Sequence, residues 1–481
     1  MKTTLLLILL FISPLLFSQT TAIPDSNFEQ RLIDLGLDDV LDGEVLTVNI
    51  YNVSTLNINN KQISDLSGIE DFTNLTILHC SYNQLTSLDL SNNIALTELY
   101  CNWNELTSLD LSNNTALALL TCEANQLTSL DLSNNIALTE LYCGFTYNQT
   151  TNQLTSLDLS NNPLISILYC EKIGLLNLDL SNNIALTELY CSTNQLTSLD
   201  LSNNTALTHV DCSANQLTSL DLTNNTNLTE LICGFEYNGW QTGGNQLTSL
   251  DLSANTALTL LNCVGNELTS LDLSNNNALI EVDCSYNQLT SLDLDNTIAL
   301  TELDCSFNQL TSLDLSNSVA LTSLNCSNNE LTELNLENND LLTALGCCSN
   351  QLTFLDCSQN ENLNDICAYD NDLICLNLNN GINFMFVVVN MNPNLYCIEV
   401  FDASFATSSG FAVVDIDPQV TFSEDCNNDC SSTSSLTELT TSKNLIQILD
   451  LVGRETTFKP NTPLIYVYDD GSTERVFTIE E

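Results

Sequence analysis

The sequence predicts a β-rich solenoid, in which successive turns of one coil stack side by side. Alternating apolar positions in Leu-x-Cys and Leu-x-Leu segments turn two or three side chains inward from a short extended segment. One coil cannot bury such a face, whereas stacked neighbours close a continuous core. The cysteines mark the period, because thirteen of them recur every 21 residues within three groups: Cys80, Cys101, Cys122 and Cys143; Cys170, Cys191, Cys212 and Cys233; Cys263, Cys284, Cys305, Cys326 and Cys347.

The chain opens with a segment typical of a secretory signal peptide. An apolar run from Leu5 to Phe17 is followed by short polar residues, and we expect cleavage near Ser18 or Ala22. The run is too short for a membrane anchor, and no later stretch has the roughly 18 consecutive apolar residues that a spanning helix needs. The sequence therefore predicts residues 1–22 as a leader and an exported mature protein.

A helix is predicted between the leader and the first coil, in residues 23–52. Its apolar positions are Phe28, Leu32, Ile33 and Leu35. Ser26 or Asn27 is expected to cap its start, and Gly36 to end it.

The repeat unit carries the pattern LxxLx(C/L)xxN twice, as the unit from Leu96 to Ala116 shows. This resembles the leucine-rich repeats of the nested-period kind, and the resemblance covers residues 53–380, or about 14 coils. It implies a right-handed coil with a parallel sheet of Leu-x-Cys strands and a second run of short Leu-Asp-Leu strands opposite. The asparagine that ends each first half, such as Asn104, is expected to turn inward and bond to backbone groups as a ladder.

The two flanking segments, residues 23–52 and 381–430, resemble the caps of secreted Bacteroidetes leucine-rich repeat proteins, which cover the open ends of the core. The lattice cysteines are expected to be reduced and buried, because in-register side chains on neighbouring strands lie farther apart than a disulfide or a tetrahedral metal site needs. Cys397 and Cys426 lie off the lattice and are the expected disulfide, with Cys430 competing for Cys426.

The C-terminal region reads as a linker and a separate module. Residues 431–442 are rich in Ser and Thr, as flexible linkers are. Residues 443–481 contain DxxGRE and YxYxDGxxxR and resemble the C-terminal sorting domain of the type IX secretion system. The resemblance implies a small β-sandwich, recognition by the type IX machinery and a secreted or outer-surface location. The alternative is an ordinary terminal β-domain.

The charge balance narrows the class of partner. Sixty acidic residues against eight basic ones give a net charge of -52. So negative a surface repels phosphate backbones and anionic lipid heads, which argues against nucleic-acid or membrane binding. Cationic partners, divalent metals and neutral glycans stay open.

The residue before each lattice cysteine is predicted to face solvent on the main sheet. Early coils place aromatic residues there, and later coils place acidic ones such as Asp211, Asp283 and Asp304. Tyrosine suits a binding surface for a protein or a glycan, although it also has high strand propensity and stacks on its neighbours. The candidate ligand-binding residues are Tyr100, Tyr142, Tyr169 and Tyr190.

Two insertions interrupt the 21-residue spacing, and both begin after a lattice cysteine with similar text. Because they leave the coil at the same point, they are expected to project from one edge, either for binding or as decorations that pack on the rim. Their candidate binding residues are Phe145, Tyr147, Phe235, Tyr237 and Trp240.

The Leu-Asp-Leu segments place an aspartate in successive coils. Like charges at the strand spacing repel by roughly 1 kcal/mol per pair in water, so something should compensate. Flanking Ser and Thr hydroxyls are one answer, and weakly held Ca²⁺ is the other. The candidate metal ligands are Asp200, Asp221, Asp251 and Asp272.

No pattern indicates catalysis. The two histidines, His79 and His209, belong to different coils, and neither a nucleophile elbow nor a zinc-binding helix motif occurs. The sequence predicts a non-catalytic binding protein, of the adhesin, receptor or adaptor type, with no obligatory cofactor. A structural surface or matrix protein with a calcium-binding acidic face is the alternative.

Overall fold

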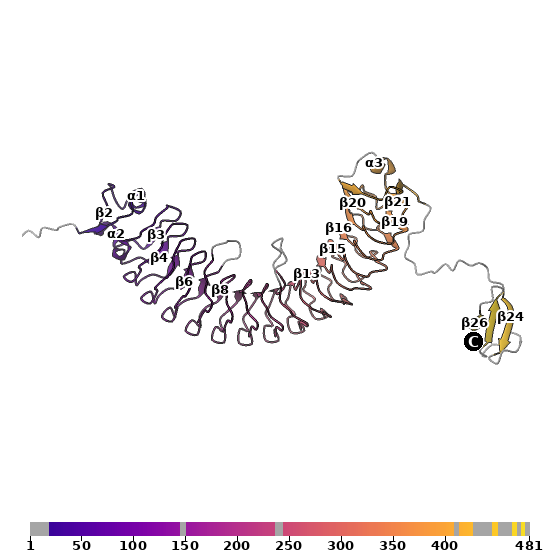
Figure 1. Cartoon of the computed structure of the whole chain (residues 1–481), viewed down its shortest axis with the longest axis horizontal. Helices are drawn as coiled ribbons and strands as arrows, with labels where there is room; N and C mark the ends of the chain where they lie inside the picture. Colours follow the sequence, from indigo (N-terminus) through magenta and orange to yellow (C-terminus); the bar gives the residue numbers. More distant parts are fainter. Residues whose placement is uncertain are drawn as a thin grey trace, which may run out of the picture. The chain divides into compact units, whose positions relative to one another are not determined.

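The computed structural model describes residues 19–144, 151–235, 244–407 and 413–426, and three strands beyond them. The chain divides into two units, residues 1–430 and 431–481. In the first unit, successive coils stack along a curved arc (Figure 1).

The first unit begins with a small α/β segment. Strand β1 (Thr20–Ala22) pairs antiparallel with β2 (Glu44–Leu46), and helix α1 (Ser26–Asp34) lies between them in sequence. The N-cap of α1 is Asp25, not Ser26 or Asn27, because the Asp25 carboxylate accepts the N–H groups of Asn27 and Phe28 at 2.9 and 3.1 Å. Gly36 follows the last turn with φ of 71°. A short helix, α2 (Thr47–Ile50), leads to the first coil.

The main sheet is parallel, and in the described residues it contains 17 strands of three residues each. It is open, because its end strands β3 and β22 pair with β4 and β20 and not with each other. From β3 to β20 the central residue of each strand faces the core and the two others face outward, whereas Val414, the central residue of the last strand β22, is exposed. The sheet runs in the order β3 (Thr55–Asn57), β4 (Ile77–His79), β5 (Glu98–Tyr100), β6 (Leu119–Thr121), β7 (Glu140–Tyr142), β8 (Ile167–Tyr169), β9 (Glu188–Tyr190), β10 (His209–Asp211), β11 (Glu230–Ile232), β12 (Leu260–Asn262), β13 (Glu281–Asp283), β14 (Glu302–Asp304), β15 (Ser323–Asn325), β16 (Ala344–Gly346), β18 (Asp365–Cys367), β20 (Phe386–Val388) and β22 (Val413–Asp415).

The solenoid prediction is confirmed, but the sheet extends past residue 380. Strands β20 and β22 continue the same parallel pairing. Buried Val387, Val389 and Asn392 keep the inward positions there, although the cysteine lattice has ended. The coil therefore depends on apolar spacing and the asparagine, while cysteine is one of several small residues that fit.

The predicted second sheet forms only in the last coils. Strands β17 (Phe354–Asp356), β19 (Cys375–Leu378), β21 (Cys397–Val400) and β23 (Thr421–Ser423) make a parallel four-stranded sheet, with the short helix α3 (Ala403–Thr407) beside β23. In the earlier coils of the described region, the Leu-Asp-Leu segments share a single isolated bridge, between Asp272 and Asp293. Their aspartates instead close local turns, since the carboxylate accepts the N–H two residues later. A one-turn 3₁₀ helix (Ile69–Asp71) occupies part of this half in the first coil.

The asparagine of the strand half joins neighbouring coils. The Nδ2 of Asn104 donates to the carbonyls of Cys80 and Cys101 at 3.0 Å each. Its Oδ1 accepts the N–H of Leu85 at 3.1 Å. All these groups are buried, so the amide replaces solvent for three backbone groups that the turn would otherwise leave unbonded.

The thirteen lattice cysteines, together with Cys357, are free and buried. Burial raises the pKa of Cys80 to about 12, which keeps the thiol protonated. Some thiols donate to the next coil, as Cys101 Sγ does to the carbonyl of Thr121 at 3.3 Å.

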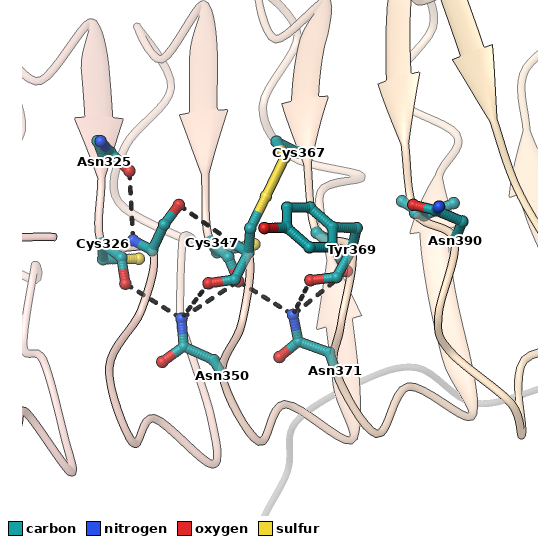
Figure 2. The surroundings of a disulfide bond; sticks show 12 residues. Asn325, Cys326, Cys347, Asn350, Cys367, Tyr369, Asn371 and Asn390 are labelled. Carbon is teal, nitrogen blue, oxygen red and sulfur yellow. Dashed lines mark hydrogen bonds between the residues drawn. A yellow bond between two sulfur atoms is a disulfide. The ribbon is translucent and has the colours of Figure 1, made fainter. Parts of the chain in front are cut away.

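Disulfides lie off the lattice. Cys397 and Cys426, the pair expected from the sequence, are joined with a Cα–Cα distance of 5.9 Å, and Cys430 lies outside the described residues. A second bond, Cys348–Cys367, was not predicted. This bond links neighbouring coils diagonally, because Cys348 follows one lattice position and Cys367 precedes the next. The two Cα atoms lie 5.6 Å apart. Figure 2 shows the bond beside the hydrogen-bonded side-chain amides of Asn350 and Asn371. Cys375 is also disulfide-bonded.

The second unit contains an antiparallel sheet of β24 (Leu445–Asp450), β25 (Leu464–Tyr468) and β26 (Thr473–Val476). The sequence predicted a β-sandwich, and the described residues of this unit form one layer. The predicted linker, residues 431–442, lies outside the described residues. Within the part of the chain that the structure covers, no helix has the length and apolarity to cross a membrane.

Candidate binding face

The outward face of the main sheet brings the predicted tyrosines together in two groups. Tyr142, Tyr169 and Tyr190 are register partners on the adjacent strands β7, β8 and β9. Their rings stack with centroid separations of 4.8 and 4.0 Å. Tyr100 is separated from them by Thr121 on β6 and stacks on His79 instead, at 4.3 Å.

Two of the tyrosine hydroxyls are held by carboxylates on their own strands. Tyr100 Oη donates to Glu98 at 2.9 Å, and Tyr142 Oη donates to Glu140 at 3.2 Å. Burial and the Glu98 carboxylate raise the pKa of Tyr100 to about 12. This region therefore presents ring edges and neutral hydroxyls, framed by negative charge, to any molecule that approaches it.

The later strands carry carboxylates where the earlier strands carry tyrosine. Glu281 and Asp283 on β13 lie in register with Glu302 and Asp304 on β14. Burial first, and then the charge of Glu302, raises the pKa of Glu281. Burial likewise raises the pKa of Asp283, although Ser285 donates two hydrogen bonds to it.

One histidine contacts a carboxylate within this negative region. His209 Nε2 lies 3.3 Å from Glu230 Oε1, and His209 Nδ1 is bonded to the Thr208 hydroxyl at 2.8 Å. The sequence itself has no lysine or arginine between Lys172 and Lys443. The negative charge of β11 to β14 is therefore left for solvent ions or a partner to balance.

Aromatic residues also lie at the turn that follows the strand in some coils, which the sequence pattern did not predict. Tyr82 and Trp103 stack at 5.2 Å, and Tyr286 and Phe307 stack at 4.1 Å. All four have φ between 54° and 59°, a left-handed conformation that costs a bulky residue about 1 kcal/mol or more. Other coils place small residues such as Ala124 and Ala214 there. The signal lay in the second residue after each lattice cysteine, which is large and aromatic in only some coils.

Comparisons with known proteins agree with this geometry. A solved structure of the functional domain of InlJ from Listeria monocytogenes, described as including a cysteine ladder, superposes with a TM-score of 0.68 and 26% identity, covering 96% of this chain and 99% of that chain. The chain folds as a leucine-rich repeat solenoid similar to that of InlJ. In this chain, the thirteen lattice cysteines recur in successive coils and are free and buried.

Two further comparisons show how far the similarity to known proteins extends. Internalin J of Listeria monocytogenes is 37% identical over 73 residues, which are 15% of this chain and 8% of that protein. A leucine-rich repeat protein of Leptospira interrogans shares the fold, with a TM-score of 0.51 and 19% identity over 78% of this chain and 97% of that one. No family model matches the sequence.

The structure describes the two insertions of this leucine-rich repeat solenoid only where they leave and rejoin the coil. Phe145, Tyr147, Tyr237 and Trp240 lie outside the described residues. Phe235 is described, and its ring lies edge-on to Tyr286 with centroids 5.8 Å apart.

The aspartates of the Leu-Asp-Leu half face solvent. Ser202 N–H donates to Asp200 at 2.9 Å, and Thr223 donates to Asp221 through N–H and hydroxyl at 3.0 and 2.7 Å. These bonds lower the pKa of both aspartates. Asp251 and Asp272 have the same bond from the residue two positions later.

The geometry of these aspartates supports compensation by neighbouring hydroxyl and N–H groups. Among the described residues, no three potential ligands of the His, Cys, Asp and Glu types come together around one point. Calcium binding stays a prediction.

Proposed function

We propose that this protein is an exported leucine-rich repeat protein that binds a partner protein through the outward face of its main sheet, without catalysis. The observation that carries the proposal is the stack of Tyr142, Tyr169 and Tyr190. Three neighbouring strands hold these rings rigidly, so the tyrosine side chains would lose little conformational entropy when a partner binds.

A protein partner suits the stack better than a glycan does. The tyrosine rings turn their faces toward one another at 4.0 and 4.8 Å, so their edges and hydroxyls meet the ligand. Sugar rings bind to open aromatic faces, whereas protein interfaces use tyrosine edges and hydroxyls together with charged neighbours. Glu140 and Glu188 occupy the other outward position on β7 and β9, and Ile167 occupies it on β8.

Export is part of the same proposal. The predicted leader ends near Ser18 or Ala22, and β1 supports the earlier position, because cleavage after Ala22 would remove a strand that pairs with β2. The buried Thr21 also donates to Asp71 at 2.6 Å. Residues 443–481 would then direct the chain through a type IX system to the cell surface or the medium.

A binding screen with the full chain tests the proposal. The immobilised protein is offered purified extracellular proteins and a glycan array, and the affinity of each hit is measured for Tyr169→Ala. Tyr396→Ala is the matched control, because Tyr396 is an exposed tyrosine of the last coils. We expect a protein ligand whose affinity falls about 30-fold for Tyr169→Ala. Its affinity for Tyr396→Ala should equal its affinity for the wild type. Hits that are all glycans, or equal losses in both variants, contradict the proposal.

A further inference from the structure

A second region of the molecule combines exposed aromatic rings with unmatched carboxylates. Phe235, Tyr286 and Phe307 form one aromatic cluster across the turns that follow β11, β13 and β14. The turn after β12 holds Gly265 between them, and a side chain at that position would overlap the Phe235 ring. Glycine thus leaves the space through which Phe235 reaches Tyr286.

The cluster has an open side. Phe307 is 41% exposed. Tyr286 covers one face of its ring, and the next coil has the smaller Asn328 at the same turn position. The other face of the Phe307 ring is therefore not covered by an aromatic neighbour among the described residues.

Carboxylates precede this cluster on the same strands. Asp283 and Asp304 lie three residues before Tyr286 and Phe307, and Glu281 and Glu302 occupy the other outward positions of β13 and β14. Asn325 Nδ2 donates to Asp304 at 2.9 Å, which leaves its charge uncompensated. The four charges are held in register at the spacing of neighbouring strands, and no lysine or arginine occurs in the sequence from residue 173 to residue 442.

We propose that the surface formed by β13, β14 and the cluster of Phe235, Tyr286 and Phe307 binds a basic segment of a partner protein. A guanidinium group stacks on the exposed part of the Phe307 ring that Tyr286 leaves uncovered, while the carboxylates of Glu281, Asp283, Glu302 and Asp304 pair with it and with neighbouring basic residues. Charge complementarity selects this occupant: a cation is attracted both by an aromatic face and by carboxylates, whereas an acidic segment or a phosphate backbone is repelled. This goes beyond the proposed function, which depends on β7 to β9.

The test measures binding of a hexa-arginine peptide to the full chain by calorimetry at about 0.15 M salt. A hexaglutamate peptide and a neutral glucose hexasaccharide are the comparison probes. Because a chain of net charge -52 attracts any polycation, the variants are matched in charge. Glu281→Gln with Glu302→Gln removes two carboxylates from the surface, and Asp110→Asn with Asp131→Asn removes two from the Leu-Asp-Leu half.

A second pair of variants isolates the aromatic ring. Phe307→Ala removes the partly exposed ring, and Tyr82→Ala removes an exposed aromatic at the same turn position far along the solenoid. Both are expected to fold, since Ala124 and Ala214 adopt the same positive φ in other coils. Thermal melting by circular dichroism verifies this.

We expect the affinity for hexa-arginine to fall about tenfold in the double variant Glu281→Gln with Glu302→Gln. It should fall about threefold in Phe307→Ala. Both controls should change it by less than about twofold. Equal losses in the matched variants overturn the proposal, because binding would then follow net charge alone. Binding of the hexasaccharide that is lost with Phe307→Ala and kept with the glutamine pair overturns it in favour of a glycan site. These outcomes are independent of Tyr169.

Discussion

The two halves of each coil carry the same nominal motif but are stabilised differently. The strand half, from the inward leucine through the lattice cysteine to its asparagine, joins a continuous parallel sheet. The Leu-Asp-Leu half is equally buried at its leucines yet forms a regular sheet only in the last coils. Similar apolar spacing therefore secures the core without securing strand pairing.

The asparagines of the two halves also differ in their hydrogen bonds. In the strand half, Asn215 donates through Nδ2 to the carbonyls of Cys191 and Cys212, and its Oδ1 accepts the N–H of Leu196. In the Leu-Asp-Leu half, Asn204 donates to the carbonyls of Leu180 and Asn183, but its buried Oδ1 has no hydrogen-bond partner in the part of the chain that the structure describes. The Asn215 amide therefore uses both its nitrogen and its oxygen in hydrogen bonds, whereas the Asn204 amide uses only its nitrogen.

The largest expected effect comes from removing the Asn215 amide. Asn215→Ala leaves a buried N–H and two buried carbonyls without their partner, and we expect it to lower the free energy of unfolding by about 3 kcal/mol. Urea unfolding followed by circular dichroism measures the loss.

The matched control is the Asn204 amide. Asn204→Ala removes two hydrogen bonds and also an unpartnered oxygen, so we expect a loss of about 1 kcal/mol. Asn204→Thr should cost less still, because Thr297 and Ser318 already occupy this position in later coils. Equal losses at Asn215 and Asn204 would show that the two ladders are equivalent and that the comparison is wrong.

A smaller effect should appear at Glu123, a carboxyl at the end of the strand half. Burial raises its pKa from 4.5 to about 7, and among the described residues its Oε2 has no hydrogen-bond partner. The folded state therefore binds a proton more tightly than the unfolded state. Its stability falls as pH rises from about 4.5 to about 7, and the loss is complete above that range.

Glu123→Gln removes this titration. We expect the variant to exceed the wild type by about 2 kcal/mol in unfolding free energy at pH about 8 and to match it at pH about 4. Glu105→Gln, a change at an exposed residue of the preceding coil, should match the wild type at both pH values. A constant difference across this pH range would refute the assignment.

The smallest effect is expected in the Leu-Asp-Leu half. Hydrogen bonds from Ser202 lower the pKa of the exposed Asp200. The stability that these bonds contribute is present above pH about 3.8 and is lost as pH falls below it. Asp200→Asn keeps the acceptor oxygen, so its melting temperature at pH about 7 should equal that of the wild type.

The effect of calcium on the melting temperature is a second test of the Leu-Asp-Leu half. If N–H and hydroxyl groups compensate the aspartates, the melting temperature is the same in millimolar calcium and in chelator. A rise of several degrees with calcium in the wild type, reduced in Asp200→Asn, would instead support the metal hypothesis.

Much of the fold followed from local chemistry that the sequence displays. The inward leucines and cysteines, the ladder asparagines and the parallel coil were predictable, because a repeated spacing has one way to bury its apolar face. The Cys348–Cys367 bond was not, since the diagonal approach of two off-lattice residues depends on the register of neighbouring coils. The turn aromatics were visible as residues, but their stacking required the positions of adjacent turns.

By itself, the sequence determined the period of the coil, the identity of its core and the sign of its surface charge, because spacing and composition act within one repeat. The tertiary structure decided which half of each coil pairs as a sheet, which tyrosines meet, and where aromatic rings come beside carboxylates. Those outcomes depend on distances of a few ångströms between different coils, and the register of stacking sets such distances.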